Sequence, residues 1–449
     1  MNKIKYIFIL LFVANSVKAQ EPKPVSGFSL EDAINYALEN NANIKKAQNN
    51  VLKAKKKVWE TTSMGFPQID GTASYQKFIE QPVQLLPAKI FNPHAQPGTY
   101  KPVKFGTEQN MKWSATLKQL IFSGSYLVGL QSSRTYKKIS ENAAVKTKQK
   151  VKEAVVNAYG NALLTEESIK ILQKNIKTVE QNLFEVKQMH QNGLVEETDV
   201  EQLQITLANL KNQVDYMQRM KNVSYEMLNF TLGKKTDDEL VLTDTIESLK
   251  EKGMQLNLLS SDFNVDNNID FQISKNQLKA KKLQIKYEKS KALPTIAAFV
   301  NYGKNAYNND FKFFDNNQAW YEQSLFGINI NIPIFSSLGR TARVKQAKLE
   351  FENAQIDISE KEKQLRLQFN KMKNEYEHSF KNYEIAKDNL KLAEKIENKE
   401  VIKFKEGVGN SFQLNQARMQ LYQSQQQYLQ SIIDIINKKI ALENILGEQ

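Results

Sequence analysis

Residues 169–194 read IKILQKNIKTVEQNLFEVKQMHQNGL, and this stretch decides the fold. Its apolar residues recur at alternating intervals of three and four, and the same rhythm resumes after Gly193. This a/d spacing is typical of a coiled-coil seam. We therefore predict two long antiparallel helices that reverse near Gly193, because glycine adopts the left-handed backbone that ends a helix. The seam positions are Ile169, Leu172, Ile176, Val179, Leu183 and Val186 before the glycine, and Val200, Leu203, Leu207, Leu210, Val214 and Met217 after it.

A second and less regular copy of this hairpin reverses near Gly407. Polar and aromatic residues occupy several of its seam positions, which predicts weaker or wetter packing than in the first hairpin. These positions are Leu365, Phe369, Met372 and Tyr376 before the glycine, and Leu414, Ala417, Leu421, Ser424 and Tyr428 after it.

Short matches between the two halves indicate an internal duplication. Gly193-Leu194 corresponds to Gly407-Val408, and Leu232-Gly233 corresponds to Leu446-Gly447, both at an offset of 214 residues. Three further matches occur in the same order, namely 52–56 with 278–282, 67–75 with 294–302, and 120–123 with 333–336. We therefore expect two structural repeats: residues 20–261, with a linker at 234–261, and residues 262–449.

Each half also contains a segment with a hydrophobic period of two, which is the period of a strand with one apolar face. We expect one strand pair within about 65–122 and another within about 293–335, each joined by a long loop. Strands of about ten to thirteen residues can cross a bilayer when tilted, for which ~9–11 are needed. The alternating apolar residues are Met111, Trp113, Ala115 and Leu117 in the first half, and Phe326, Ile328, Ile330, Ile332 and Ile334 in the second.

Two lengths predict how the chain assembles. The segment from Phe122 to Gly193 gives roughly 100 Å of helix at 1.5 Å per residue, and a helix over 29–63 would stack on the shorter arm beyond Gly193 to match it. Four strands cannot close a membrane barrel, and the smallest barrels have eight. Copies of the chain must therefore pool strands, giving eight in a dimer or twelve in a trimer. An eight-stranded barrel is filled by its own side chains, so we favour the trimer for a duct.

Residues 1–19 are typical of a secretory signal peptide. Lys3 and Lys5 precede the apolar run from Tyr6 to Ala14, and the small residue Ala19 stands at the cleavage position. This run is too short to span a bilayer, which takes about 20 apolar residues. We therefore expect an exported mature chain.

The composition argues against several classes of function. The chain has no cysteine and only three histidines, far apart in sequence, so no thiolate nucleophile or zinc-ligand spacing is present. The net charge of +13 comes mainly from lysine, which solvates helix surfaces more often than it reads nucleic acid. We expect no catalytic site, no metal, no cofactor and no nucleic-acid partner.

The chain resembles the TolC-like outer-membrane efflux proteins over its whole mature length. The resemblance rests on 28–33 and 37–41 in the first helix, on Phe335 with Gly339-Arg340 at a strand-to-helix junction, and on the two tip glycines. It implies a mainly α protein with membrane β structure: a homotrimer with a periplasmic α-barrel tunnel of antiparallel coiled-coil helices and a shared twelve-stranded β-barrel in outer-membrane lipid. It also implies a periplasmic adaptor and an inner-membrane pump of RND or ABC type, for which the trimer is a passive duct in efflux or type I secretion.

The resemblance assigns two groups of site residues. In the best-known relatives, the helix after the second tip carries two pore-facing aspartates, and the aligned positions here are Gln413 and Gln416. Asp199 matches an acidic residue of the closed-state tip network, but its expected tyrosine and arginine partners correspond to Phe404 and Gly409. We therefore predict a pore constriction at Asp199, Phe404, Gln413 and Gln416 that has no carboxylate ring. The predicted adaptor-docking tips are Gly193, Leu194, Gly407, Val408 and Gly409.

Other interpretations of the same residues stay open at this point. Gly193 and Gly407 could be helix C-caps of any helical hairpin, and Gln413 and Gln416 could face solvent outside the tube. A periplasmic adaptor would contain one hairpin flanked by small β domains. A structural or adhesive coiled-coil protein of the cell surface would lack amphipathic strands of membrane length. A cytosolic nucleic-acid-binding coiled coil would have no signal peptide.

Overall fold

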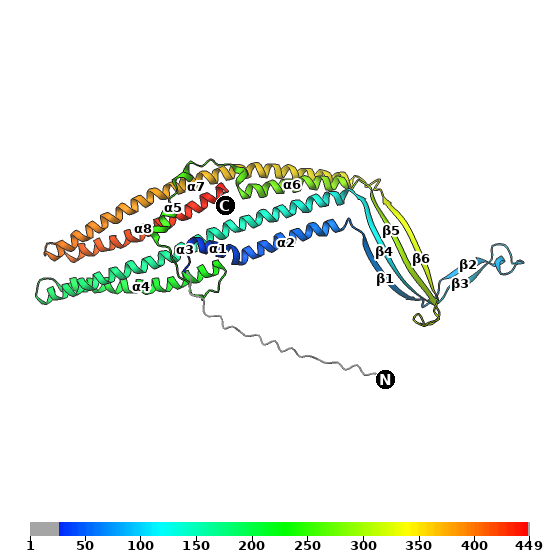
Figure 1. Ribbon diagram of the computed structural model, residues 1–449, viewed down its shortest axis with the longest axis horizontal. Helices are drawn as coiled ribbons and strands as arrows, with labels where there is room; N and C mark the ends of the chain where they lie inside the picture. Colours follow the sequence, from blue (N-terminus) through cyan, green and yellow to red (C-terminus); the bar gives the residue numbers. More distant parts are fainter. Residues whose placement is uncertain (1–26, 448–449) are drawn as a thin grey trace, which may run out of the picture. The chain divides into compact units, whose positions relative to one another are not determined.

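The computed structural model of the protein describes residues 27–447, and the expected signal peptide at 1–19 lies outside the described residues. The described chain is mostly helical (Figure 1). Its helices are α1 Leu30–Asn40, α2 Ala42–Ser63, α3 Gly124–Gln191, α4 Glu197–Leu232, α5 Ile246–Gly253, α6 Ile269–Ser290, α7 Gly339–Lys405 and α8 Ser411–Leu446. Its strands are β1 Gln68–Lys77, β2 Val83–Pro87, β3 Tyr100–Lys104, β4 Gln109–Ser123, β5 Thr295–Asn308 and β6 Trp320–Asn331. Short 3₁₀ turns lie at Ala88–Ile90, Leu256–Ser260 and Val265–Asn267.

The chain divides into two compact units. The helical unit contains 27–42, 150–260 and 374–441 of the described chain, and the sheet unit contains 43–149, 261–373 and 442–447. The long helices α3 and α7, of 68 and 67 residues, contribute to both units. Within residues 27–447, no helix combines the length and the apolar character needed to cross a membrane.

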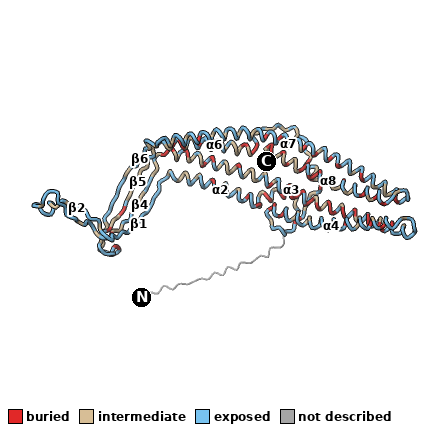
Figure 2. The backbone as a smooth tube through the Cα atoms, turned by 180° about the vertical axis from the view of Figure 1, so that it is seen from behind, coloured by how far each residue is buried: buried red, intermediate tan, exposed pale blue. Residues whose placement is uncertain are grey.

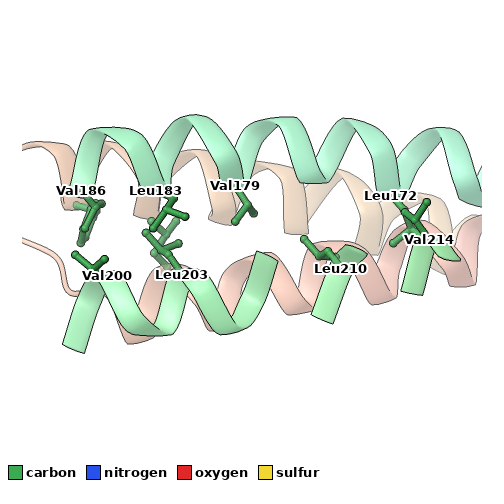
Figure 3. Close-up of a cluster of buried hydrophobic side chains, with 10 residues drawn as sticks. Leu172, Val179, Leu183, Val186, Val200, Leu203, Leu210 and Val214 are labelled. Atoms are coloured by element: carbon green, nitrogen blue, oxygen red, sulfur yellow. The ribbon is translucent and has the colours of Figure 1, made fainter. Parts of the chain in front are cut away.

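The core of the helical unit follows the predicted seam. In Figure 3, side chains of α3 and α4 meet between the two antiparallel helices near the first tip. Phe404 of α7 and Leu414 of α8 complete the same buried cluster, so the two hairpins pack against each other. The cluster residues from the first hairpin are Leu172, Val179, Leu183, Val186, Val200, Leu203, Leu210 and Val214.

The sheet unit holds a four-stranded antiparallel sheet in the order β1-β4-β5-β6. Its strands have 10 to 15 residues, so β4 and β5 are longer than the ten to thirteen residues expected from the sequence. Most of β1 and β6 is exposed in Figure 2, because these two strands form the edges of the sheet. Adjacent strands are antiparallel throughout, with one register shift between Leu120 and Phe122 of β4.

Equivalent contacts close the shorter helical arm in each half. Gly233 after α4 has φ +82°, and a Cβ there would lie 2.6 Å from the Asn40 carbonyl oxygen. Gly447 after α8 has φ +81° and approaches the Asn267 carbonyl in the same way. The neighbouring Asn41 and Asn268 amides donate hydrogen bonds to the Thr231 and Ile445 carbonyls, respectively. Both glycines are therefore required by a left-handed backbone and by a close approach.

Three predictions about element boundaries were wrong. The expected single helix over 29–63 is broken at Asn41, whose extended backbone (ψ 135°) ends α1 and whose amide bonds to Thr231. The second strand pair ends at Asn331 rather than near 335, because Pro333 has no N–H for a ladder hydrogen bond. The proline-rich segment expected as a loop contains β2 and β3, so the described chain has six strands rather than four. The linker at 234–261 also contains the short helix α5.

Candidate membrane sheet and hairpin tips

One face of the four-stranded sheet is apolar and uncovered. The register pairs Ile69 with Leu117, Leu117 with Val300, and Val300 with Phe326, which places one apolar residue from each strand in a single row. All four side chains are exposed, with Ile69 at 72% and Phe326 at 66%. Apolar residues also follow on β6, where Ile328 and Ile330 are exposed. An apolar sheet face of this size is normally covered or placed in lipid.

The opposite face of the sheet is polar and hydrogen-bonded across the strands. Thr72 and Ser114 hydroxyls lie 2.9 Å apart, and the Asn301 amide donates to the Thr116 hydroxyl at 2.7 Å. Lys118 Nζ lies 3.2 Å from the Asp70 carboxylate. Because side chains alternate along a strand, these residues face away from the row of Ile69 and Leu117. The sheet therefore has one apolar face and one polar, hydrogen-bonded face.

An arginine fixes the junction between β6 and α7. Arg340 donates from Nη1 to the Pro333 carbonyl at 2.7 Å, from Nη2 to the Ile334 carbonyl at 3.1 Å, and from Nε to Ser336 Oγ at 3.0 Å. Ser337 and Leu338 have positive φ values of 46° and 64°, which a non-glycine residue rarely adopts. The guanidinium thus satisfies carbonyls that the interrupted strand leaves free, and it holds a strained turn.

Both hairpin tips end their first helix with the same motif. Gly193 has φ +73°, its N–H bonds to the His190 carbonyl at 2.9 Å, and the Leu194 N–H bonds to the Met189 carbonyl at 2.9 Å. This is the Schellman arrangement of a helix C-terminus. At the second tip, Gly407 has φ +71°, and the Val408 N–H bonds to the Lys403 carbonyl at 3.0 Å.

The residue after each tip glycine is apolar and exposed. Leu194 is 70% exposed and Val408 is 78% exposed. Gly409 is packed more closely, because a Cβ there would lie 3.0–3.2 Å from atoms of Lys403 and Phe404. The predicted tip residues therefore lie together at two matching turns, each of which presents one aliphatic side chain to solvent.

A polar link joins the two hairpins just beyond the tips. The Ser411 hydroxyl donates a hydrogen bond to Asp199 Oδ1, and Asp199 Oδ2 accepts one from the Glu196 N–H at 3.3 Å. Gln202 Oε1 lies 3.1 Å from the same serine hydroxyl. Ser411 is the first residue of α8, so the Asp199 carboxylate lies at a helix N-terminus, where the helix dipole favours negative charge.

The comparison with known families decides the identity of the chain. The outer membrane efflux protein family matches residues 33–233 and 265–448, which is most of the sequence. This chain belongs to that family. An outer membrane efflux protein acts in the outer membrane, and the family is one of efflux proteins rather than enzymes.

Solved structures share the fold of this efflux protein. VceC, an outer membrane protein of Vibrio cholerae, is 13% identical, with 93% of this chain and 96% of that chain covered and a TM-score of 0.72. The CmeC outer membrane channel of Campylobacter jejuni is 16% identical, with 93% and 85% covered and a TM-score of 0.69. The open state of the MtrE outer membrane channel of Neisseria gonorrhoeae is 15% identical, with 93% and 88% covered and a TM-score of 0.69. No curated protein matches the sequence of this chain significantly.

The residues assigned to the constriction of this efflux protein do not form one cluster. Asp199 takes part in the link between the hairpins, whereas Phe404 is buried in the hydrophobic cluster with Leu414. Gln413 and Gln416 are exposed on α8, and the Gln413 N–H is capped by Asn410 Oδ1 at 2.8 Å. A role for these four residues in gating the efflux protein stays a prediction.

Two functional candidates were missed from the sequence. Ser411 could not be read as the partner of Asp199, because the two residues are 212 positions apart. Arg418 is 1% exposed, its Nε lies 3.5 Å from Glu397 Oε1, and neither of its terminal nitrogens has a hydrogen-bond partner. Burial lowers the pKa of this guanidinium. Nothing in the sequence around Arg418 indicated that this arginine is buried.

Proposed function

We propose that this chain is the outer-membrane duct of a tripartite efflux or type I secretion system, through which substrates pass passively. The observation that carries the proposal is the four-stranded sheet, which has one apolar exposed face, one polar face and two unpaired edge strands. In lipid, unpaired edges leave backbone N–H and C=O groups without partners, so the sheet requires further strands. Other copies of the same chain supply them.

The polar face favours three copies over two. An eight-stranded barrel from two copies would fill its interior with its own side chains. Here the interior would be lined by hydrogen-bonded polar groups such as Thr72, Ser114 and Asn301, which suits a water-filled lumen. A homotrimer with a twelve-stranded barrel, its apolar face in outer-membrane lipid, is the assembly that we propose.

The helical unit supports pooling of helices among the copies. On α4, the exposed residues Ile205, Tyr216 and Val223 recur on one face, and on α7 the exposed residues Ile385, Leu392 and Ile396 do the same. Both stripes lie outside the cores of their own hairpins. Contacts between such stripes of adjacent copies would close the helices into an α-barrel tunnel.

The hairpin tips are the proposed docking site for a periplasmic adaptor. Leu194 and Val408 are exposed apolar side chains at rigid glycine-ended turns, which suits contact with a partner helix. The adaptor would connect the duct to an inner-membrane pump of RND or ABC type. Asp199, Phe404, Gln413 and Gln416 belong to the constriction in this proposal, with the bond from Ser411 to Asp199 holding the two hairpins together.

Cysteine-directed cross-linking in intact cells tests this function. The chain contains no cysteine, so Val408→Cys introduces a single attachment point for a photoreactive maleimide at the second tip. We expect it to capture a periplasmic adaptor, identified by mass spectrometry. Gln96→Cys, exposed between β2 and β3, is the matched control and should capture none. Equal capture from both positions, or capture of no adaptor from Val408→Cys and Leu194→Cys, would contradict the proposal.

A further inference from the structure

One segment of α8 is nearly free of charged residues. Residues 411–433 contain a single Asp, Glu, Lys or Arg, namely Arg418, whereas the 25% charged content of the whole chain would give about six. The equivalent segment of α4, residues 197–219, does contain six, and five of these are exposed. The two helices have the same length, 36 residues, and follow the same kind of turn. The difference therefore lies in what the two helices face.

The exposed side of this α8 segment is made of glutamine. Six glutamines recur at intervals of three and four, so they lie along one face of the helix. All six are exposed, and the exposed apolar residues Phe412 and Met419 flank them. The glutamines are Gln413, Gln416, Gln420, Gln423, Gln427 and Gln430.

The one charge in the segment is kept away from this face. Arg418 is buried against Glu397 of α7, and its guanidinium does not reach solvent. The glutamine face therefore carries only neutral amides, which donate and accept hydrogen bonds without a net charge.

The glutamine face continues into a groove between the hairpins. A cavity of about 680 Å³ lies between α8 and the first hairpin, and Gln423 and Gln427 belong both to it and to the glutamine face. Its other amides are Asn175, Asn209, Gln213 and Gln426. Tyr422 is its only titratable group, and burial raises the pKa of this phenol to about 12. The groove is therefore neutral at physiological pH.

The glutamine face could lie on the outer surface of the protein, in an interface with another protein, or along an aqueous passage. An outer surface in this lysine-rich chain carries charges, as α4 does with Glu201, Lys211 and Asp215. An interface with another protein is apolar at its centre, with charged residues depleted. A row of six hydrated amides fits neither pattern, but it fits the wall of a narrow aqueous passage, where fixed charges would select ions by their sign.

We propose that the glutamine face of α8, which begins beside the link between Ser411 and Asp199, lines the narrow end of the duct with an uncharged wall, so that solutes of either charge pass along it. The proposal rests on the proposed function, because the three glutamine rows can face one another only if three copies of the chain surround one axis. Cargo selection by charge must then occur at the adaptor or pump rather than in this part of the duct.

Ion selectivity of the full-length protein in planar lipid bilayers tests the proposal, with K⁺ and Cl⁻ as the probes. In a potassium chloride gradient, we expect wild-type permeabilities for K⁺ and Cl⁻ that agree within about twofold. Gln416→Lys should shift the ratio at least about threefold toward Cl⁻, and Gln416→Asp should shift it toward K⁺. Gln204→Lys and Gln204→Asp, on the charged face of α4, are the matched controls and should leave the ratio unchanged.

The outcomes separate this proposal from the function on which it rests. A wild-type protein that conducts one of the two ions with strong preference would contradict the proposal of a neutral lining, but not the proposal that the protein is a duct. Equal shifts from Gln416→Lys and Gln204→Lys would also overturn it. Absence of conductance in the wild type would contradict the proposal that the protein is a duct.

Two further measurements support the comparison. The native mass of each variant in detergent shows whether assembly is unchanged. We also expect a cationic thiol reagent to block the conductance of Gln420→Cys but not that of Gln204→Cys.

Discussion

The two helical hairpins have the same geometry but different seams. Each ends its first helix at a glycine with φ near +70° and continues into a 36-residue helix. The first hairpin supplies eight of the ten buried residues in the shared hydrophobic cluster, and all eight are leucine or valine. The second supplies Phe404 and Leu414, and its seam also buries Arg418 and Ser424. Helix length and glycine position thus set the shape of each hairpin. We infer that the seam residues set its stiffness.

This difference indicates which hairpin moves more easily. Aliphatic side chains in a close-packed seam resist displacement, because any gap loses contacts. A seam that buries an arginine without hydrogen-bond partners for its terminal nitrogens is less stable, because those nitrogens lose their hydration without full compensation. We infer that the first hairpin is the rigid part of the tip region and that the second is the part whose position can change.

Breaking the buried ion pair should have the largest effect on this comparison. Glu397→Gln leaves Arg418 buried without a counter-charge, so we expect a loss of about 3–5 kcal/mol of stability. The combined change Glu397→Leu and Arg418→Met should recover most of it, because a neutral pair needs no desolvation. Thermal unfolding in detergent, followed by circular dichroism, measures both. A smaller loss for Glu397→Gln than for the double variant would contradict the pairing.

Truncation in the aliphatic seam should have the next largest effect. Leu203 is 1% exposed in the cluster, and Leu203→Ala should cost about 3 kcal/mol through lost burial and a cavity. Ser424→Ala, in the seam of the second hairpin, should cost less than about 1 kcal/mol, because a serine contributes little apolar contact. Limited proteolysis and thermal unfolding measure the two changes, and equal losses would remove the difference between the hairpins.

The tip glycines should behave alike in both hairpins. No atom lies near the position of a Cβ at Gly193 or Gly407, so alanine there meets only the strain of a left-handed backbone. We expect Gly193→Ala and Gly407→Ala each to cost about 1–2 kcal/mol. Gly129→Ala, inside α3 with ordinary φ, should instead stabilise by about 0.5–1 kcal/mol. A clear difference between the two tip variants would show that one tip has extra contacts.

The smallest effect concerns an exposed ion pair between the hairpins. A hydrogen bond from Gln181 and the ammonium of Lys405, 3.1 Å away, lower the pKa of Glu185. Lys405→Met should cost less than about 1 kcal/mol at neutral pH, because exposed pairs contribute little. The lowered pKa makes this contribution complete above the ordinary pKa of a glutamate, and it disappears as pH falls through the lowered value. A cost that does not decrease as pH falls below the ordinary pKa of a glutamate would contradict this assignment.

Periodic patterns predicted the fold where contacts repeat along the chain. The spacing from Leu172 to Val186 identified the residues that are buried in the first hairpin, and Gly193 and Gly407 have the left-handed backbone that reversal requires. The prediction failed where a single long-range contact determines the backbone conformation. Asn41 breaks a helix by bonding to Thr231, which lies 190 residues away.

The site residues depend on such long-range contacts too. Phe404 was assigned to the constriction from its alignment, and its side chain lies in the hydrophobic cluster where the two hairpins pack together, so its role in the constriction stays a prediction. The strands β2 and β3 were missed because Pro87 and Pro102 argue against a strand. Proline is tolerated there because each strand of a two-stranded sheet has a free edge.

The native mass of the protein extracted from outer membranes in mild detergent tests the proposed duct most directly. Three copies of the mature chain are expected, because the edge strands β1 and β6 must pair with other copies and two copies would leave no lumen. A monomer from the same membranes would contradict the shared barrel, and a dimer would contradict the water-filled one.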